Sequence, residues 1–352
     1  MLRQVFFGGI FDKLPQDVYR SWFVYQMRVS QALIIISMVS FIAGSTVLML
    51  RYGSLHGDLM LGGLVLFYVG IMFSQHPGFT RVMPSPFASI LIGLLAVTWI
   101  ITYTLGLWFN WIVGVILVLY YALLLIIRGG LGRKPLYWPN TFFLSGLISL
   151  AIAFYMSDFR LLVFPVASIA SLMRRVESRQ RPIYAVDIPY TVLLPVMTYF
   201  LDNPIVLAVF SLFTLVVIGV PRRFGQAFNT IYARAYSIGS SLGRVSLIIT
   251  AILSLIGVPL GDAIHMFFIG FIAVIMSSLC IPMLNPGILW FSMRHYGIAG
   301  FEIPTLLFIS AILRAIYYLV SFQLIIISLI LVFIAYIEVA VSYLSGERIK
   351  VL

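Results

Sequence analysis

Apolar runs of about 20 residues follow one another along the whole chain, with only short polar breaks between them. A helix needs about that length to cross a hydrocarbon core about 30 Å thick. The chain is 62% hydrophobic and 9% charged, whereas a soluble domain carries about 25% charged residues. Because lipid satisfies no backbone polar group, runs that face lipid have to be helical. The predicted fold class is all-α, a polytopic transmembrane helix bundle.

The breaks occur at charges and at Gly, Pro and Asn clusters, and they predict about twelve spans in one integral membrane domain, residues 1–352. The spans are expected at 29–50, 59–75, 86–105, 107–127, 140–157, 160–173, 189–202, 203–220, 245–260, 262–284, 303–321 and 322–345.

The fifth and eleventh spans begin alike, near Asn140 and near Pro304. Each is fifth in a set of six, so a parallel duplication would divide the chain into six-helix halves, 1–180 and 181–352.

The Lys and Arg residues fall almost entirely on one side when the spans alternate in direction. Of the 22 such residues, Arg51 and Arg160 fall in loops on the other side, and Arg314 falls within a span. Short loops rich in Lys and Arg stay in the cytoplasm. The predicted location is the plasma membrane, with multiple passes and both termini cytoplasmic.

The formal net charge of +11 would suggest a nucleic-acid partner in a soluble protein. Here the positive residues lie in the inner loops, so the expected partners are the lipid bilayer and its anionic headgroups, without nucleic acid. In the stretch 221–244 four arginines alternate with aromatic residues, which predicts an interfacial amphipathic helix. Recognition of a specific protein partner is the alternative. The predicted lipid-interface residues are Arg222, Arg223, Arg234 and Arg244.

Ionisable residues inside a membrane are functional candidates because burying them there is unfavourable. Asp262 and His265 are three residues apart and share a helix face. His265, with His56 on the same outer side, is a candidate metal or haem ligand, and Asp262 would orient its ring. The alternative is that Asp262 and His265 form a purely structural hydrogen bond.

Arg314 and Glu338 lie in the last two spans, which should pack as a hairpin. We expect an ion pair between them, because a lone charge is unfavourable in a low-dielectric interior. One alternative is that each side chain reaches its own interface separately. Another is a bridge from either residue to a different helix, which would favour a transporter.

No catalytic motif is visible in the sequence. It contains no DxxxD carboxylate pair, no HExxH pattern and no Walker loop. The single cysteine, Cys280, excludes an internal disulfide and a cysteine-based zinc or iron–sulfur site. Whether the protein is an enzyme, and which cofactor it binds, is left open by these residues.

The segment 262–288, DAIHMFFIGFIAVIMSSLCIPMLNPGI, resembles the NnrS family, and the segment 161–175, LLVFPVASIASLMRR, is similar to the sixth helix of that family. NnrS proteins are twelve-helix membrane proteins that contain haem and copper. The resemblance implies that His265 is a haem or metal ligand near the outer face. The sequence departs from the family where it has Ser277, Ser278 and Cys280 in place of a further histidine, and it contains only four histidines. It therefore resembles a divergent member that lacks most of the histidine ligands.

Three functions follow as hypotheses. The first is an NnrS-like redox or nitric-oxide-related role, with the haem bound or lost. The second is a secondary transporter or permease for a small solute, for which Pro165, Pro195 and Pro259 would supply broken helices. The third is a non-catalytic subunit of a larger membrane complex.

Overall fold

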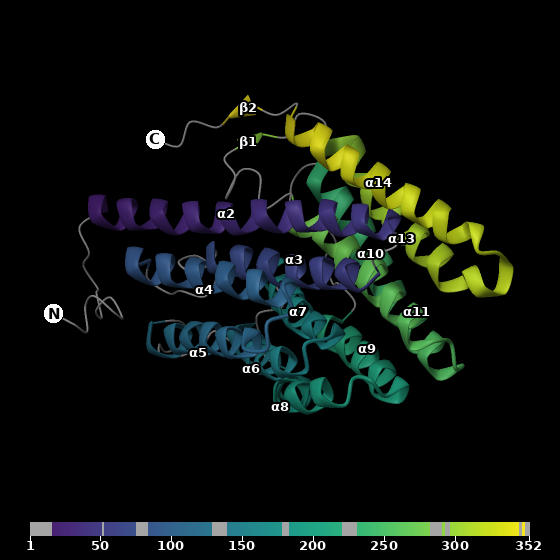
Figure 1. Cartoon of the computed structure of the whole chain (residues 1–352), viewed down its shortest axis with the longest axis horizontal. Helices are drawn as coiled ribbons and strands as arrows, with labels where there is room; N and C mark the ends of the chain where they lie inside the picture. The colour runs from purple at the N-terminus through teal and green to yellow at the C-terminus, as the bar shows by residue number, and fades with distance from the viewer. Residues whose placement is uncertain are drawn as a thin grey trace. The chain divides into compact units, whose positions relative to one another are not determined.

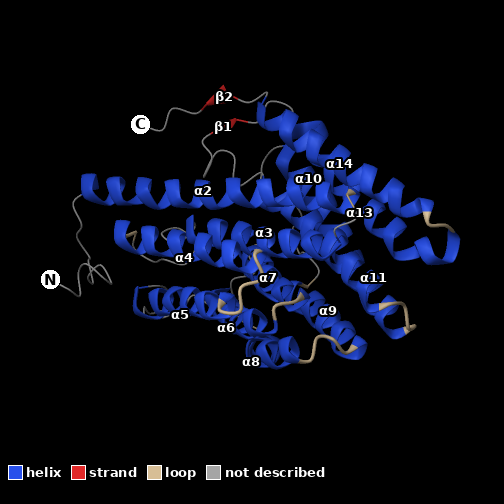
Figure 2. Ribbon diagram, viewed as in Figure 1, coloured by secondary structure: helices blue, strands red, loops and turns tan. Residues whose placement is uncertain are grey.

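The computed structural model describes residues 16–50, 53–74, 84–128, 139–177, 183–219, 231–281, 291–292, 296–344 and 347–348. Nearly all of these residues are helical (Figures 1 and 2). The α-helices are α2 (Gln16–Met49), α3 (Gly53–Ser74), α4 (Pro86–Thr104), α5 (Asn110–Arg128), α6 (Pro139–Met156), α7 (Val163–Val176), α8 (Tyr184–Tyr199), α9 (Pro204–Ile218), α10 (Ile231–Leu255), α11 (Leu260–His265), α13 (Tyr296–Val320) and α14 (Gln323–Leu344).

Shorter elements complete the described chain. A 3₁₀ turn, η3 (Phe159–Leu162), precedes α7, and two π-helical stretches, η4 (Met266–Ala273) and η5 (Met276–Cys280), continue α11. The short strands β1 (Phe291–Ser292) and β2 (Glu347–Arg348) pair antiparallel.

The helical fold class is confirmed, and each expected span overlaps a helix of the structure, with different bounds. Among the residues that the structure describes, six helices are long and apolar enough to cross a membrane, by length and composition. They are Arg20–Met49, Gly53–Phe73, Pro86–Thr104, Tyr236–Leu255, Leu260–Cys280 and Gln323–Ser342. Asn110–Ile126, Asn140–Met156 and Pro204–Ile218 are shorter apolar helices.

The helix α10 begins earlier than its apolar run. It starts at Ile231, so the part of the expected interfacial helix from 231 to 244 is continuous with the apolar part of α10 and is not a separate element. Arg222 and Arg223 lie outside the described residues, and Arg234 lies within α10. The sequence analysis did not predict this continuity. Alternating polar and apolar residues are typical of an interfacial helix and also of a helix that packs on a neighbouring part of the protein.

The prolines do not break the helices in the expected way. Pro165 lies in the first turn of α7 and Pro259 is the N-cap of α11, two positions where a missing N–H removes no hydrogen bond of the helix. Pro195 lies inside α8, which continues to Tyr199. The departure from α-helical geometry is instead found in η4 and η5, which contain no proline.

The chain divides into two compact units. The first comprises residues 1–171 and 191–199, and the second comprises 172–190 and 200–352. A duplication of two six-helix halves stays a prediction.

The first unit is held together mainly by α2, α3 and α4, with α5 packed on α4 and on α6 (Figure 1). The Ser37 hydroxyl donates to the Gly63 carbonyl at 2.6 Å and joins α2 to α3. A buried aromatic group in this unit contains Trp99, which stacks on Tyr103 and contacts Phe154.

The second unit is organised around α10, which packs on α9, α13, η4 and η5. Two glycines one turn apart, Gly239 and Gly243, let α10 approach these π-helical stretches closely. A Cβ atom at Gly239 would overlap Ser278, and one at Gly243 would lie 2.8 Å from Ile275 Cδ1. Such a small-xxx-small pattern is typical of helix contacts in membranes.

Candidate functional site

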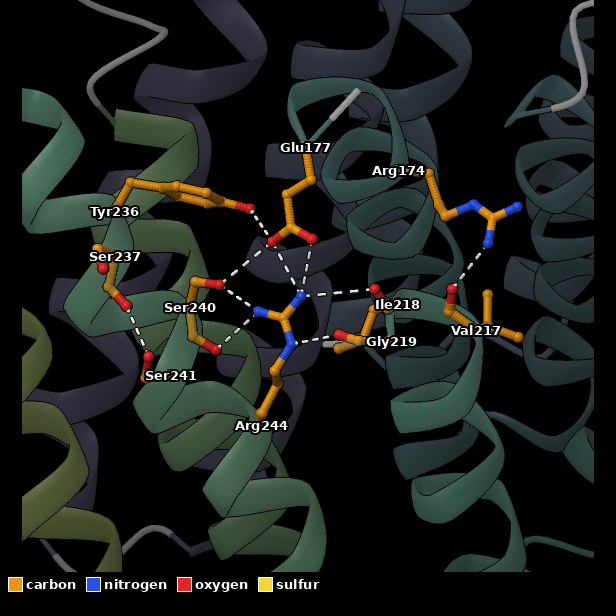
Figure 3. Close-up of polar contacts among 10 residues, drawn as sticks. All are labelled: Arg174, Glu177, Val217, Ile218, Gly219, Tyr236, Ser237, Ser240, Ser241 and Arg244. Carbon is orange, nitrogen blue, oxygen red and sulfur yellow. Dashed lines mark hydrogen bonds and ion pairs between the residues drawn. The ribbon is translucent and has the colours of Figure 1, made fainter. Parts of the chain in front are cut away.

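A buried acid–base cluster joins Glu177, Arg244 of α10 and the last residues of α9 (Figure 3). Glu177 follows directly after α7, and Arg244 lies in α10. The Arg244 Nη2 atom lies 2.9 Å from both Glu177 Oε1 and Oε2. Both residues are buried, so this is a desolvated ion pair, which is stable only if the remaining polar atoms are also satisfied.

Neighbouring groups satisfy those atoms. Tyr236 donates to Glu177 Oε1 at 2.8 Å, and the Ser240 hydroxyl donates to the same oxygen at 3.3 Å. Arg244 Nε donates to the Gly219 carbonyl at 2.7 Å, and Nη1 donates to the carbonyl and the hydroxyl of Ser240. Each guanidinium nitrogen therefore has an oxygen partner (Figure 3).

A second arginine binds the same end of α9. Arg174 donates from Nη1 to the Val217 carbonyl at 3.1 Å and from Nη2 to Asp187 Oδ2 at 2.6 Å. The Ile183 amide also donates to Asp187 Oδ2. The last turn of a helix carries unsatisfied carbonyls and a partial negative charge. Arg174 and Arg244 therefore compensate the partial negative charge at this end of α9. Each arginine is also paired with a carboxylate, Arg174 with Asp187 and Arg244 with Glu177.

The position of Arg244 corrects a sequence prediction. Its assignment to the lipid interface is wrong, because the side chain is buried against Glu177 and the end of α9. Its role in the structure is to join α10 to α7 and α9.

A different ion pair joins α11 to α13. Arg314 Nη1 lies 3.4 Å from Asp262 Oδ1, and the Arg314 guanidinium carbon lies 4.7 Å from the centre of the Tyr317 ring. The expected pair of Arg314 with Glu338 is not formed between these two described residues. Arg314 bridges to another helix, the alternative that the sequence left open, because Asp262 offers a fully buried carboxylate whereas Glu338 is only half-buried.

The Asp262–Arg314 pair lacks the dense hydrogen bonding of the Glu177–Arg244 pair. Asp262 is 3% exposed and its Oδ2 atom has no hydrogen-bond partner among the described residues, and the same holds for Arg314 Nη1. The 3.4 Å contact is an ion pair without hydrogen-bond geometry. Buried polar atoms in native proteins nearly always have partners, so exceptions point to water, strain or a ligand.

The two candidate histidine ligands lie in different units. His56 lies in α3, with Nδ1 2.9 Å from the Gly44 carbonyl of α2. His265 ends α11, with Nδ1 2.6 Å from the Gly261 carbonyl. Within the described ranges no group of three or more His, Cys, Asp and Glu side chains could hold a metal ion. These residues do not fit a copper centre with several histidine ligands.

Sequence reasoning did not identify Glu177, Asp187 and Tyr236 as members of a site. One signal was available, because Glu177 and Asp187 are isolated acids in a stretch otherwise rich in arginine, in a chain with only 11 acids. An acid at the C-terminal end of a helix opposes the helix dipole and needs a cation nearby. The partner of Glu177 lies 67 residues further along the chain, so pairing could not be read from local spacing.

Comparison with the models of known protein families and with characterised proteins finds no match to this chain.

Proposed function

We propose that the chain is a plasma-membrane protein with about twelve membrane-spanning helices and both termini in the cytoplasm. The support comes from the six apolar helices of spanning length, the three shorter apolar helices and the one-sided distribution of Lys and Arg. In this orientation the Glu177–Arg244 cluster lies at the cytoplasmic end of its helices and the Asp262–Arg314 pair lies toward the outer end.

Arg160 is an exception to the charge rule with a structural reason. It donates from Nε to the carbonyls of Thr198 and Tyr199 and pairs with Asp158. Its charge is therefore compensated by the end of α8 and by a carboxylate, and it does not contradict the proposed orientation.

Within that arrangement, we propose that the protein is a secondary transporter for a small polar or ionised solute. One observation carries this proposal: the Asp262–Arg314 pair, in which the carboxylate is buried, links α11 to α13 and leaves polar atoms without partners among the described residues. Transporters hold their solutes at sparse intramembrane polar groups, beside helices of irregular geometry. The π-helical stretch η4 begins at Met266, one turn after Asp262, and such stretches are frequent at functional sites.

Reconstitution into proteoliposomes tests the proposal. We expect at least one of formate, acetate, glycine and glucose to enter liposomes that contain the protein faster than protein-free liposomes. The Arg314→Leu variant should lose this flux, and the control variant Glu338→Leu, which removes the half-buried acid of α14, should keep it. Equal flux into protein-containing and protein-free liposomes for every solute would refute a transporter of this kind.

An NnrS-like haem protein is the second candidate, and the contact of His265 Nδ1 with the Gly261 carbonyl supports it. A backbone carbonyl at one ring nitrogen orients many metal-binding histidines. The optical spectrum of the purified protein, expressed with haem supplied, is the test. A Soret band that the His265→Ala variant lacks would support this candidate, and a colourless wild-type protein would reject it.

A further inference from the structure

We propose that Asp262 and Arg314 form a site that binds a small carboxylate anion together with one proton. This inference rests on the proposed transporter function and names its substrate class. The anion would pair with the Arg314 guanidinium, and the proton would be held by the Asp262 carboxyl. The geometry, the burial and the charge balance of the pair each support this assignment.

The pair is held together less tightly than the other buried ion pairs of the same unit. The nitrogen–oxygen distance is 3.4 Å for Arg314 and Asp262, against 2.9 Å for Arg244 and Glu177 and 2.6 Å for Arg174 and Asp187. Arg244 has hydrogen bonds at each guanidinium nitrogen, whereas Arg314 Nη1 has none among the described residues. Asp262 therefore restrains Arg314 through charge alone, and another anion can compete for the guanidinium.

The atoms left without partners define what the site can bind. Arg314 has a planar guanidinium whose parallel N–H groups match the two oxygens of a carboxylate. The Arg314 side chain is 22% exposed, while that of Asp262 is 4% exposed. The arginine is thus the more accessible of the two charged residues. The Tyr317 ring covers the guanidinium at 4.7 Å from its centre and helps to orient it.

Charge balance explains why a proton must accompany the anion. In the described state the negative charge of Asp262 compensates the positive charge of Arg314. Adding an anion alone would leave a net negative charge in a low-dielectric environment, which is strongly unfavourable. If one proton binds Asp262 Oδ2, the neutral carboxyl releases Arg314, and the anion replaces it as the counter-charge. The net charge of the site is then unchanged, and no bond other than the new O–H bond is formed.

The surroundings contain few other groups that could take the proton. The elements packed on α11 are α10, η4 and α13. The outer half of α10, residues 245–255, and η4 contain no titratable residue. On α13 the titratable residues near Arg314 in sequence are Tyr317 and Tyr318, and α11 itself contributes His265. His265 is therefore the one competitor to be tested beside Asp262.

Formate binding to the full-length protein in lipid nanodiscs tests the inference, with calorimetry as the readout. Formate stays ionised between about pH 5.5 and about pH 8, so it adds no proton of its own. We expect the affinity of the wild type to fall about tenfold for each pH unit above the titration of Asp262, with uptake of about one proton per formate. Buffers with different ionisation enthalpies report that uptake directly, without any variant.

Three variants assign the proton and the anion to their groups. Asp262→Asn should bind formate with a pH-independent affinity and no proton uptake, and Arg314→Gln should bind it at least about tenfold more weakly. His265→Gln should keep the pH dependence of the wild type. Formate binding without proton uptake by the wild type, or an unchanged pH dependence in Asp262→Asn, would overturn the inference. So would the absence of formate binding by folded wild type at about pH 5.5.

The outcome also separates this inference from the transporter proposal. Formate binding with proton uptake but no flux into proteoliposomes would retain the site and reject the transporter. Flux of another solute that persists in Arg314→Gln, together with no formate binding by the wild type, would retain a transporter and reject the site.

Discussion

Glu177 lies where a negative charge is unfavourable, directly after the last turn of α7. The structure compensates it with a bidentate contact from Arg244 and with hydroxyl groups of Tyr236 and Ser240. Because neither charge is accessible to water, removing one leaves the other uncompensated. The energetic consequence of a single substitution should therefore exceed that of removing both charges.

We expect Arg244→Leu to lower the free energy of unfolding by about 3–5 kcal/mol, because the carboxylate of Glu177 would stay buried without its partner. The double variant Glu177→Leu with Arg244→Leu should recover much of this loss. Unfolding of the purified protein in detergent, followed by circular dichroism, measures both. Ser241→Ala is the matched control on α10, because Ser241 donates only to the Ser237 carbonyl. A double variant less stable than the single one would contradict the account.

The partner of Arg314 can be tested by a double-mutant cycle. Arg314→Leu and Asp262→Leu should be coupled by about 0.5–3 kcal/mol, because the two side chains contact each other. Arg314→Leu and Glu338→Leu should be additive within about 0.5 kcal/mol. The same unfolding measurement applies to both cycles. Coupling in the second cycle and additivity in the first would restore the pair expected from the sequence.

At the scale of the elements, the sequence predicted where helices occur, but it did not predict the π-helical geometry within them. Apolar run length located each described helix, but α2, α3, α8, α10 and α13 start several residues earlier than expected. The difference is largest for α2 and α10, because these two helices begin with polar and charged residues. The π-helical geometry of η4 and η5 has no signal in hydropathy. The glycines of IGSSLG, residues 238–243, match no phosphate-binding loop, and the structure shows that they serve close helix packing.

Gly239 offers a direct test of that packing. We expect Gly239→Ala to lower the free energy of unfolding by about 1–3 kcal/mol, because its Cβ would overlap Ser278 across the contact of α10 with η5. Adding Ser278→Gly should restore part of the stability. Gly57→Ala in α3 is the control, since a Cβ there has no neighbour within 4 Å, and it should be neutral or stabilising by up to about 1 kcal/mol. If Gly239→Ala behaves like Gly57→Ala, the helices do not pack as closely as described.

For the whole molecule, the apolar runs and the composition predicted the helical class, but they could not predict which charged residues form pairs. Glu177 and Arg244 are 67 residues apart, and Arg174 and Val217 are 43 residues apart. Such contacts depend on how the helices pack, and the spacing of residues within one segment of the sequence does not predict that packing. His56 and His265, grouped by their expected membrane side, lie in separate units.

The orientation of the whole chain can be measured by cysteine labelling, after replacing the buried Cys280. We expect Trp108→Cys, in the exposed turn between α4 and α5, to react from outside intact cells with an impermeant maleimide. Tyr184→Cys, at the exposed start of α8, should react only after the cells are opened. The reverse pattern would place the termini outside.

The distance between Glu177 and Arg244 along the chain also has a consequence for biosynthesis. Glu177 leaves the ribosome 67 residues ahead of Arg244. At about 5–20 residues per second, several seconds pass while α8 and α9 are made, and the carboxylate must stay hydrated during that time. In the proposed orientation, Arg244 is one of the positive charges that direct the insertion of α10. Its ion pair with Glu177 would form only after that step, so the same side chain would first orient its helix and then join it to α7 and α9.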